Sequence, residues 1–220
     1  MTADAAARAA LVVYGLGIAV AFGLRTVVHR QRTGSGGFRG LSGRPGSAGW
    51  WGGISFAAAL VLGAAGPAAA WAGAVVPPGR PPVLLTVAGL VLALVGFAGV
   101  VLAQGGMGSS WRIGVDADER TELVTGGAFA VVRNPIFTAM CTALLGLAAM
   151  VPTPVSVAAF GCLVVAVELQ VRAVEEPYLR RVHGRDHAEY CAAVGRFVPG
   201  VGRSRPAGER RGRPRGHRRP

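Results

Sequence analysis

The sequence predicts an all-α integral membrane protein with about five transmembrane helices, of which the last two form a short helical hairpin ahead of a cytoplasmic C-terminal segment. Composition supports this class, because 51% of the 220 residues are hydrophobic, only 15% are charged, and the mean hydropathy is +0.44. These values are typical of a polytopic membrane protein rather than an ordinary globular domain. Long apolar segments and the positions of the arginines support the same class independently.

Five apolar segments, almost free of charge, define the predicted helices. A helix that crosses a hydrocarbon core of about 30 Å needs roughly 20 apolar residues. The second and third segments reach that length, whereas the last two are short. The turn Pro152-Thr153-Pro154 separates these two and predicts a tight hairpin packed against the other helices. In chain order the segments are Ala9–Leu24, Ile54–Val76, Val83–Ala103, Ile136–Val151 and Val155–Val167.

The arginines predict how these helices are oriented, because cytoplasmic loops of membrane proteins carry an excess of arginine and lysine. Five arginines lie between the first two helices, three lie between the third and fourth, and thirteen lie from Arg172 onward, whereas only Arg8 and Arg80 fall on the other side. Five spans with the N-terminus outside bring the three basic regions together in the cytoplasm of a cell-membrane protein. A signal peptide is the alternative for Ala9–Leu24, but the arginines follow this segment instead of preceding it.

The chain is predicted to have three parts. Residues 1–82 hold the first two helices and a basic loop, residues 83–200 hold the other three helices with a cytoplasmic site, and residues 201–220 form an arginine-rich tail. The tail has no apolar pattern, so we expect it to be disordered and to touch anionic lipid head groups. Nucleic acid is not an expected partner, because no aromatic side chain interleaves the arginines of the tail to stack on bases.

Cysteine and histidine do not indicate a metal site or a disulfide framework. Two of the three cysteines lie within predicted membrane helices, and the spacing of the three suits no zinc site. His183 and His187 have i,i+4 spacing, which binds metal only where a third ligand is present, and the sequence offers none of a suitable type. No metal is therefore expected.

Polar residues at the ends of the two short helices indicate a functional site. Arg133 precedes the fourth helix. Ionisable groups at a membrane surface are costly unless they are paired or used. Two interpretations stay open: a ladder of salt bridges where the fifth helix leaves the lipid, or a polar pocket that faces Arg133 and binds a cationic, polar-headed cofactor. Four residues after the fifth helix have i, i+4, i+7 and i+8 spacing and are predicted to share one helix face: Glu168, Arg172, Glu175 and Glu176.

Two ordered motifs carry a resemblance to a known family. The first is Leu123-Val124-Thr125-Gly126-Gly127-Ala128-Phe129 followed by Val132-Arg133-Asn134-Pro135-Ile136-Phe137, and the second consists of Glu175-Glu176, His183-Gly184, Tyr190 and Arg196-Phe197-Val198-Pro199. Over residues 84–200 the chain resembles the isoprenylcysteine carboxyl methyltransferase and phospholipid methyltransferase group of integral membrane enzymes. The patterns of that group are Thr-x-Gly-Pro-Tyr, Arg-His-Pro-x-Tyr, Glu-Glu, Gly, Tyr and Arg-Phe-Ile-Pro, in this order.

The resemblance implies a methyltransferase that uses S-adenosylmethionine, and it implies a role for each matching residue. Arg172 and Glu176 would be catalytic, with Glu176 also holding polar groups of the cofactor together with Glu175. Asn134 stands where the group has histidine, Ala128 where it has proline, and two phenylalanines where it has tyrosines, so the choice of substrate is open. The resemblance places these further residues around the cofactor: Val124, Thr125, Gly127, Phe129, Arg133, Asn134 and Pro135.

The acceptor that the resemblance implies is lipophilic or lipidated. The sequence shows no well-placed histidine base, which favours an acceptor group that is already ionised at neutral pH, such as a carboxylate. The alternative function is a non-catalytic membrane scaffold or a transporter-like protein that uses the same Glu/Arg pairs as internal ion pairs. The halves of the chain show no inverted repeat, which counts against a transporter. The oligomeric state does not follow from the sequence.

Overall fold

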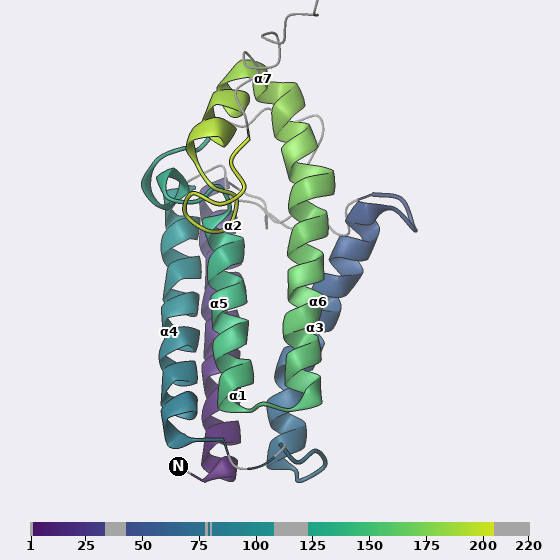
Figure 1. Cartoon of the computed structure of the whole chain (residues 1–220), viewed down its shortest axis with the longest axis vertical. Helices are drawn as coiled ribbons and strands as arrows, with labels where there is room; N and C mark the ends of the chain where they lie inside the picture. The colour runs from purple at the N-terminus through teal and green to yellow at the C-terminus, as the bar shows by residue number, and fades with distance from the viewer. Residues whose placement is uncertain (1, 34–42, 78, 80, 108–122, 205–220) are drawn as a thin grey trace, which may run out of the picture.

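The computed structural model describes residues 2–33, 43–77, 79, 81–107 and 123–204, and this part of the chain is helical without a named strand (Figure 1). Short π-helices interrupt two of the long helices, and a 3-10 turn precedes the fifth α-helix. The elements are α1 (Ala3–Ile18), the π-helix η1 (Ala19–Leu24), α2 (Arg25–Thr33), α3 (Ala48–Trp71), α4 (Val83–Gly106), the 3-10 helix η3 (Gly127–Ala130), α5 (Pro135–Met150), α6 (Pro154–Leu169), the π-helix η4 (Gln170–Glu175) and α7 (Glu176–Ala193).

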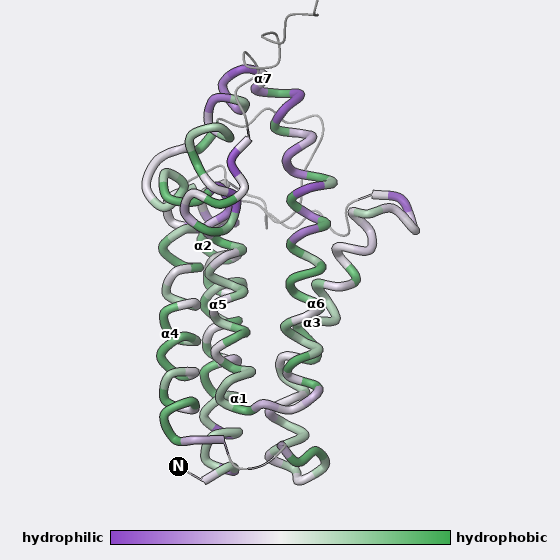
Figure 2. The backbone as a smooth tube through the Cα atoms, viewed as in Figure 1, coloured by the Kyte–Doolittle hydropathy of each residue, from purple (hydrophilic) through white to green (hydrophobic). Residues whose placement is uncertain are grey.

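The helices of the described residues confirm the predicted all-α class, and their lengths and composition agree with an integral membrane protein. In the described residues, four continuous helices are long and apolar enough to cross a membrane: Ala3–Val28, Ala48–Trp71, Val83–Gly106 and Pro154–Ala193. The fifth predicted span, α5, is apolar but has only 16 residues, so the number of five remains a prediction. Apolar residues cover the shafts of the bundle and hydrophilic residues gather on α7 (Figure 2). By hydropathy, α6 and the parallel shafts are therefore better suited to a membrane than α7.

The predicted hairpin exists, but its two helices pack mainly on other partners. Val151–Thr153 connect α5 to α6, and the Thr153 hydroxyl caps α6 by accepting a hydrogen bond from the Ser156 N–H at 3.1 Å. Beyond this turn α5 packs most extensively against α4, and α6 packs most extensively against α3 (Figure 1). The connection is as tight as predicted, but α5 and α6 pack less extensively on each other than on α4 and α3.

Small residues explain why α4 and α5 form such a close pair. Without a hydrophobic driving force inside lipid, helices associate where glycine and alanine let their backbones approach. A methyl group added at Gly96 would lie 2.6 Å from the Cα atom of Ala143. One added at Gly89 would lie 2.6 Å from the carbonyl oxygen of Gly146. The glycines on both helices are therefore required by the contact itself.

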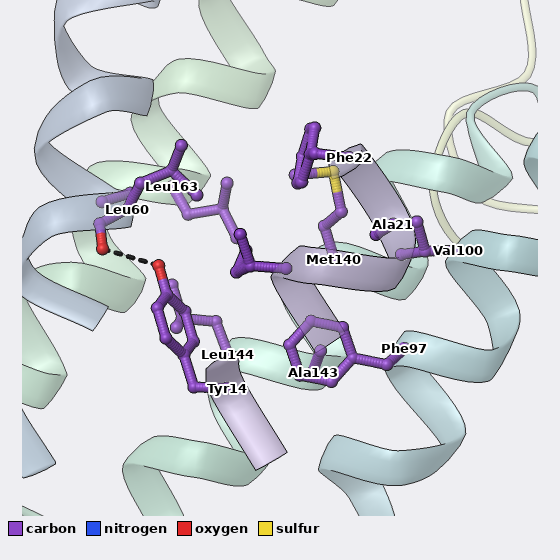
Figure 3. A pocket seen from close by; sticks show the side chains of 12 residues that line it. Tyr14, Ala21, Phe22, Leu60, Phe97, Val100, Met140, Ala143, Leu144 and Leu163 are labelled. Atoms are coloured by element: carbon purple, nitrogen blue, oxygen red, sulfur yellow. Dashed lines mark hydrogen bonds between the residues drawn. The ribbon is translucent and has the colours of Figure 1, made fainter. Parts of the chain in front are cut away.

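The N-terminal helix packs on the bundle and lines a small, partly open apolar pocket. Tyr14 donates a hydrogen bond to the Leu60 carbonyl at 2.6 Å, which ties α1 to α3 (Figure 3). Gln104 of α4 donates to the Ala21 carbonyl in η1 at 3.1 Å. The pocket between these helices has a volume of about 30 Å³, roughly the share of one water molecule. Met140 and other apolar side chains line it (Figure 3).

Candidate functional site

Two segments that lie far apart in the sequence, Val132–Asn134 and Gly195–Arg196, are joined by hydrogen bonds at the end of the bundle where α5 begins. Val132 forms an isolated parallel bridge with Gly195. The Arg133 N–H donates to the Gly195 carbonyl at 2.8 Å, and both the backbone N–H and the side-chain amide of Asn134 donate to the Arg196 carbonyl at 3.1 Å. The start of α5 and the segment after α7 therefore lie side by side and are joined by hydrogen bonds (Figure 1).

A kink in α7 allows the chain to return to α5. Gly184 has φ +46° and ψ −108°, which is outside the helical region and favoured only by glycine. The helix changes direction at this residue, so the second half of α7 turns back toward the bundle (Figure 1). The kink also lies between His183 and His187, the pair with i,i+4 spacing.

A buried ion-paired centre links the start of α5 and the segment after α7 to Glu176. Arg196 binds the Glu176 carboxylate with two parallel hydrogen bonds, from Nε at 2.8 Å and from Nη2 at 2.9 Å. Arg133 Nη1 lies 3.2 Å from Oε1 of the same carboxylate. The exposed fractions of the three side chains are 4% for Arg133, 13% for Glu176 and 19% for Arg196. One carboxylate between two guanidinium groups leaves a net charge of +1 with little access to water.

The arginines keep Glu176 ionised. Burial by itself raises the pKa of a carboxyl group. For Glu176 this effect is outweighed by the hydrogen bond from Arg196 and by the positive charges of Arg133 and Arg196, so its pKa lies below the usual value. Glu176 is therefore a carboxylate at neutral pH. Its contribution to stability is present above the pKa of the unfolded chain and is lost as the pH falls through the lower folded-state pKa.

Arg133 joins three parts of the chain. Besides Glu176, its Nη1 atom donates to the Cys191 thiol in α7, and its Nη2 atom donates to the Gly202 carbonyl at 2.8 Å. Its Nε atom is buried and has no hydrogen-bond partner within the described part of the chain. Gly202, a residue that the sequence assigned to the tail, therefore contacts this centre. Residues 205–220 of the predicted tail lie outside the described residues.

The predicted cofactor-binding turn lies beside this centre. Phe129 in η3 is buried, and its carbonyl accepts a hydrogen bond from the Tyr190 hydroxyl at 2.6 Å. Burial raises the pKa of Tyr190 to about 12, so the hydroxyl stays protonated and available as this donor. Val124 is half-buried, whereas Thr125 and Gly127 are exposed. No described atom would lie within 4 Å of a methyl group added at Gly127, so one face of the turn is open.

The predicted shared face of carboxylates is only half correct. Arg172 pairs with Glu168, as the i,i+4 spacing predicts, and both side chains are exposed, at 58% and 38%. Glu176 instead pairs with Arg133 and Arg196. The reason is η4, because a π-helical turn holds more residues than an α-helical turn and changes the register between Arg172 and Glu176. Glu175, at the end of η4, is half-buried.

Three further residues, to which the sequence analysis gave no role in the site, lie at or beside this centre. Arg196 is the bidentate partner of Glu176, and its place in the Arg-Phe-Val-Pro motif could have identified it as a site residue. No sequence motif contains Thr138. Its hydroxyl lies 2.9 Å from the Phe197 carbonyl and connects α5 to the same returning segment. His187 is buried against Cys191, with Nε2 at 3.5 Å from the sulfur, and within the described ranges no three potential metal ligands lie together.

Comparisons with known proteins indicate the same group of enzymes as the resemblance. Residues 84–186 match the Phospholipid methyltransferase family. The chain is also 30% identical over 89 residues to Protein-S-isoprenylcysteine O-methyltransferase B of Arabidopsis thaliana, a stretch that covers 40% of this chain and 45% of that relative. The match thus spans less than half of the relative's length. No solved structure matches the chain significantly.

The matched region includes α4, η3, α5, α6 and the first half of α7, which are the elements that carry Arg133 and Glu176 to the polar centre. The first motif and the Glu175-Glu176 and His183-Gly184 parts of the second lie inside this region, whereas Tyr190 and Arg196–Pro199 lie beyond it. Through residues 84–186, this chain is similar to the phospholipid methyltransferase family.

Proposed function

We propose that this protein is a membrane-embedded methyltransferase that transfers a methyl group from S-adenosylmethionine to a lipophilic or lipidated acceptor. The observation that carries the proposal is the centre formed by Arg133, Glu176 and Arg196, which closes one end of an apolar bundle. The similarity to the family indicates the reaction class. The position of the centre at the end of an apolar bundle favours a lipophilic acceptor, because membrane lipids would have direct access to the helices of the bundle. A scaffold without catalysis is not favoured by the family match.

The residues around the centre fit S-adenosylmethionine. Its carboxylate suits the net positive charge of the centre, and its cationic groups suit Glu175, which is half-buried and one residue from the paired Glu176. The exposed face of the turn at Thr125 and Gly127 leaves backbone groups accessible to the remainder of the cofactor. The apolar pocket of about 30 Å³ between the helices is too small for it.

Each predicted site residue has a place in this proposal. Val124, Thr125, Gly127 and Phe129 line the cofactor from the η3 side, and Glu175 and Glu176 face its polar groups from the α7 side. The start of α5, from Arg133 through Asn134 to Pro135, fixes the distance between these two sides through its bonds to the returning segment. Arg172 lies at the exposed edge and is proposed to act on the acceptor.

The reaction makes modest chemical demands on the chain. S-adenosylmethionine, when bound, supplies a methyl group on a sulfonium, and the acceptor's nucleophile forms the new bond while the sulfur keeps the electron pair of the bond that breaks. The protein must align the two partners and exclude water. His187 is buried against Cys191 and is not placed to act as a base. This arrangement favours an acceptor that is already ionised, such as a carboxylate.

A binding titration tests the proposal. Detergent-solubilised full-length protein is expected to bind S-adenosylmethionine and S-adenosylhomocysteine saturably in a calorimeter. The Glu176→Gln change removes the charge but keeps the shape, and it is expected to weaken this binding about tenfold to a hundredfold, which corresponds to one lost charge-assisted interaction. Absence of binding by the unaltered protein would refute the proposed function.

The proposed orientation places the N-terminus outside and the polar centre in the cytoplasm. Reporter fusions after Pro78 and after Pro199 are expected to report opposite sides of the membrane, with the second in the cytoplasm, because the arginine-rich regions lie at the α7 end. A fusion in the first basic loop, after Arg44, is the control and should agree with the fusion after Pro199. Both reporters on the same side would contradict an odd number of spans.

A further inference from the structure

The two arginines that pair with Glu176 differ in which of their guanidinium N–H groups are not used in hydrogen bonds within the described chain. Arg133 uses Nη1 for Glu176 and Cys191 and uses Nη2 for Gly202, while its Nε atom is enclosed by protein. Its side chain is 4% exposed. A ligand therefore has no free approach to this guanidinium. Arg133 holds α5, α7 and the returning segment together.

Arg196 is placed differently. Its Nε and Nη2 atoms both bind Glu176, so the guanidinium is held edge-on to the carboxylate. In the described part of the chain no hydrogen-bond partner is found for its Nη1 atom. The side chain is 19% exposed, which is more than either partner in the centre. Nη1 is thus the nitrogen of the Arg196 guanidinium that Glu176 does not use.

The backbone of Arg196 is also fixed before any ligand arrives. Its carbonyl accepts from the backbone and the side chain of Asn134, and its N–H donates to the Val201 carbonyl at 2.8 Å. Glu176 fixes the side chain as described above. A donor that is held in this way loses little conformational entropy on binding, which increases the affinity that each hydrogen bond contributes.

From these contacts we infer that Arg196, through Nη1, is the residue that binds a carboxylate of the ligand, and that Arg133 is a positioning residue. A carboxylate completes the charge balance, because it neutralises the net +1 left by two guanidinium groups and Glu176 in a partly buried site. The inference rests on the proposed function, which offers two sources of this carboxylate: the amino-acid part of the methyl donor and the acceptor. Both are the same chemistry for a guanidinium.

Paired ligands separate these sources. The donor pair is S-adenosylmethionine and its decarboxylated form, and the acceptor pair is S-farnesylated N-acetylcysteine and its methyl ester. Each is titrated calorimetrically into the full-length protein and into Arg196→Gln, Arg196→Lys and Arg181→Gln. Arg181 is exposed on α7 and serves as the matched control for the loss of one positive charge.

We expect Arg196→Gln to weaken binding of the carboxylate member of one pair about tenfold to a hundredfold and binding of its carboxylate-free partner by less than about threefold. Lysine keeps the charge but lacks the planar fork, so Arg196→Lys should fall between these results. The pair that shows the difference identifies the source of the carboxylate. Arg181→Gln should change neither pair.

Two outcomes would overturn the inference while leaving the proposed function intact. Equal losses for both members of each pair would mean that Arg196 only supports the fold, and unchanged affinities would remove it from the site. Failure of the unaltered protein to bind the methyl donor would instead refute the proposed function itself. Melting temperatures of the same variants separate lost binding from lost folding.

Discussion

Arg133→Gln is expected to lower the free energy of unfolding by about 3 kcal/mol, which is the lower end of the range for breaking a buried ion pair. The change removes the donors to the Cys191 thiol and the Gly202 carbonyl and one of two positive charges on Glu176. Arg196 still neutralises that carboxylate, which limits the loss. Thermal unfolding of the detergent-solubilised protein measures the effect.

Arg172→Gln is the matched control for this loss. It also removes an arginine from an ion pair, but the pair with Glu168 is exposed. Exposed pairs contribute about 0–1 kcal/mol, so its melting temperature should stay close to that of the unaltered protein. Equal melting temperatures for Arg133→Gln and the unaltered protein would show that the returning segment is held by other contacts.

Gly96→Ala is expected to disrupt the α4·α5 pair and to destabilise the protein by about 1–3 kcal/mol or more, the range for overpacking. The added methyl group would lie 2.6 Å from the Ala143 Cα atom and closer still to its backbone nitrogen. Because both atoms belong to a helix backbone, no side-chain movement relieves the clash and the helices must separate. α5 carries Arg133, so such a separation also displaces the polar centre.

Gly161→Ala offers the same chemical change at a position without the contact. Gly161 lies in α6, is exposed, and has no described atom within 4 Å of the added methyl group. Alanine is the better helix former, so this variant should be neutral or slightly more stable. Comparing melting temperatures and methyl-donor affinities of the two variants measures the close contact separately from helix propensity. Similar values for both would contradict the tight α4·α5 interface.

Two of the helices could be predicted closely because lipid imposes a simple rule on the sequence. A spanning segment must be apolar and must satisfy its backbone hydrogen bonds internally, so the predicted Val83–Ala103 and Ile136–Val151 differ from the observed Val83–Gly106 and Pro135–Met150 by only a few residues. The fifth helix, predicted to end at Val167, continues through η4 into α7. Charge marks the end of the apolar part but does not end a helix.

The site was predicted in part, and the errors have a physical cause. The motifs located Arg133 and Glu176, and the structure brings them together. Helical periodicity predicts that Glu176 shares a face with Arg172. This prediction holds only for a continuous α-helix, and the structure has a π-helix through residues 170–175. The sequence predicts no role for Arg196, because its contact with Glu176 forms only where the chain turns back after Gly184.

The sequence by itself determined the class of the protein, the apolar helices and the two ordered motifs, since each of these depends on local composition and spacing. Only the tertiary structure decided which charges are paired, because ion pairs form between residues brought together by the kink at Gly184 and the π-helical turn before Glu176. It also decided that α5 packs on α4 and α6 on α3, since that choice depends on which glycines face one another. Contacts between distant segments depend on geometry that no local pattern specifies.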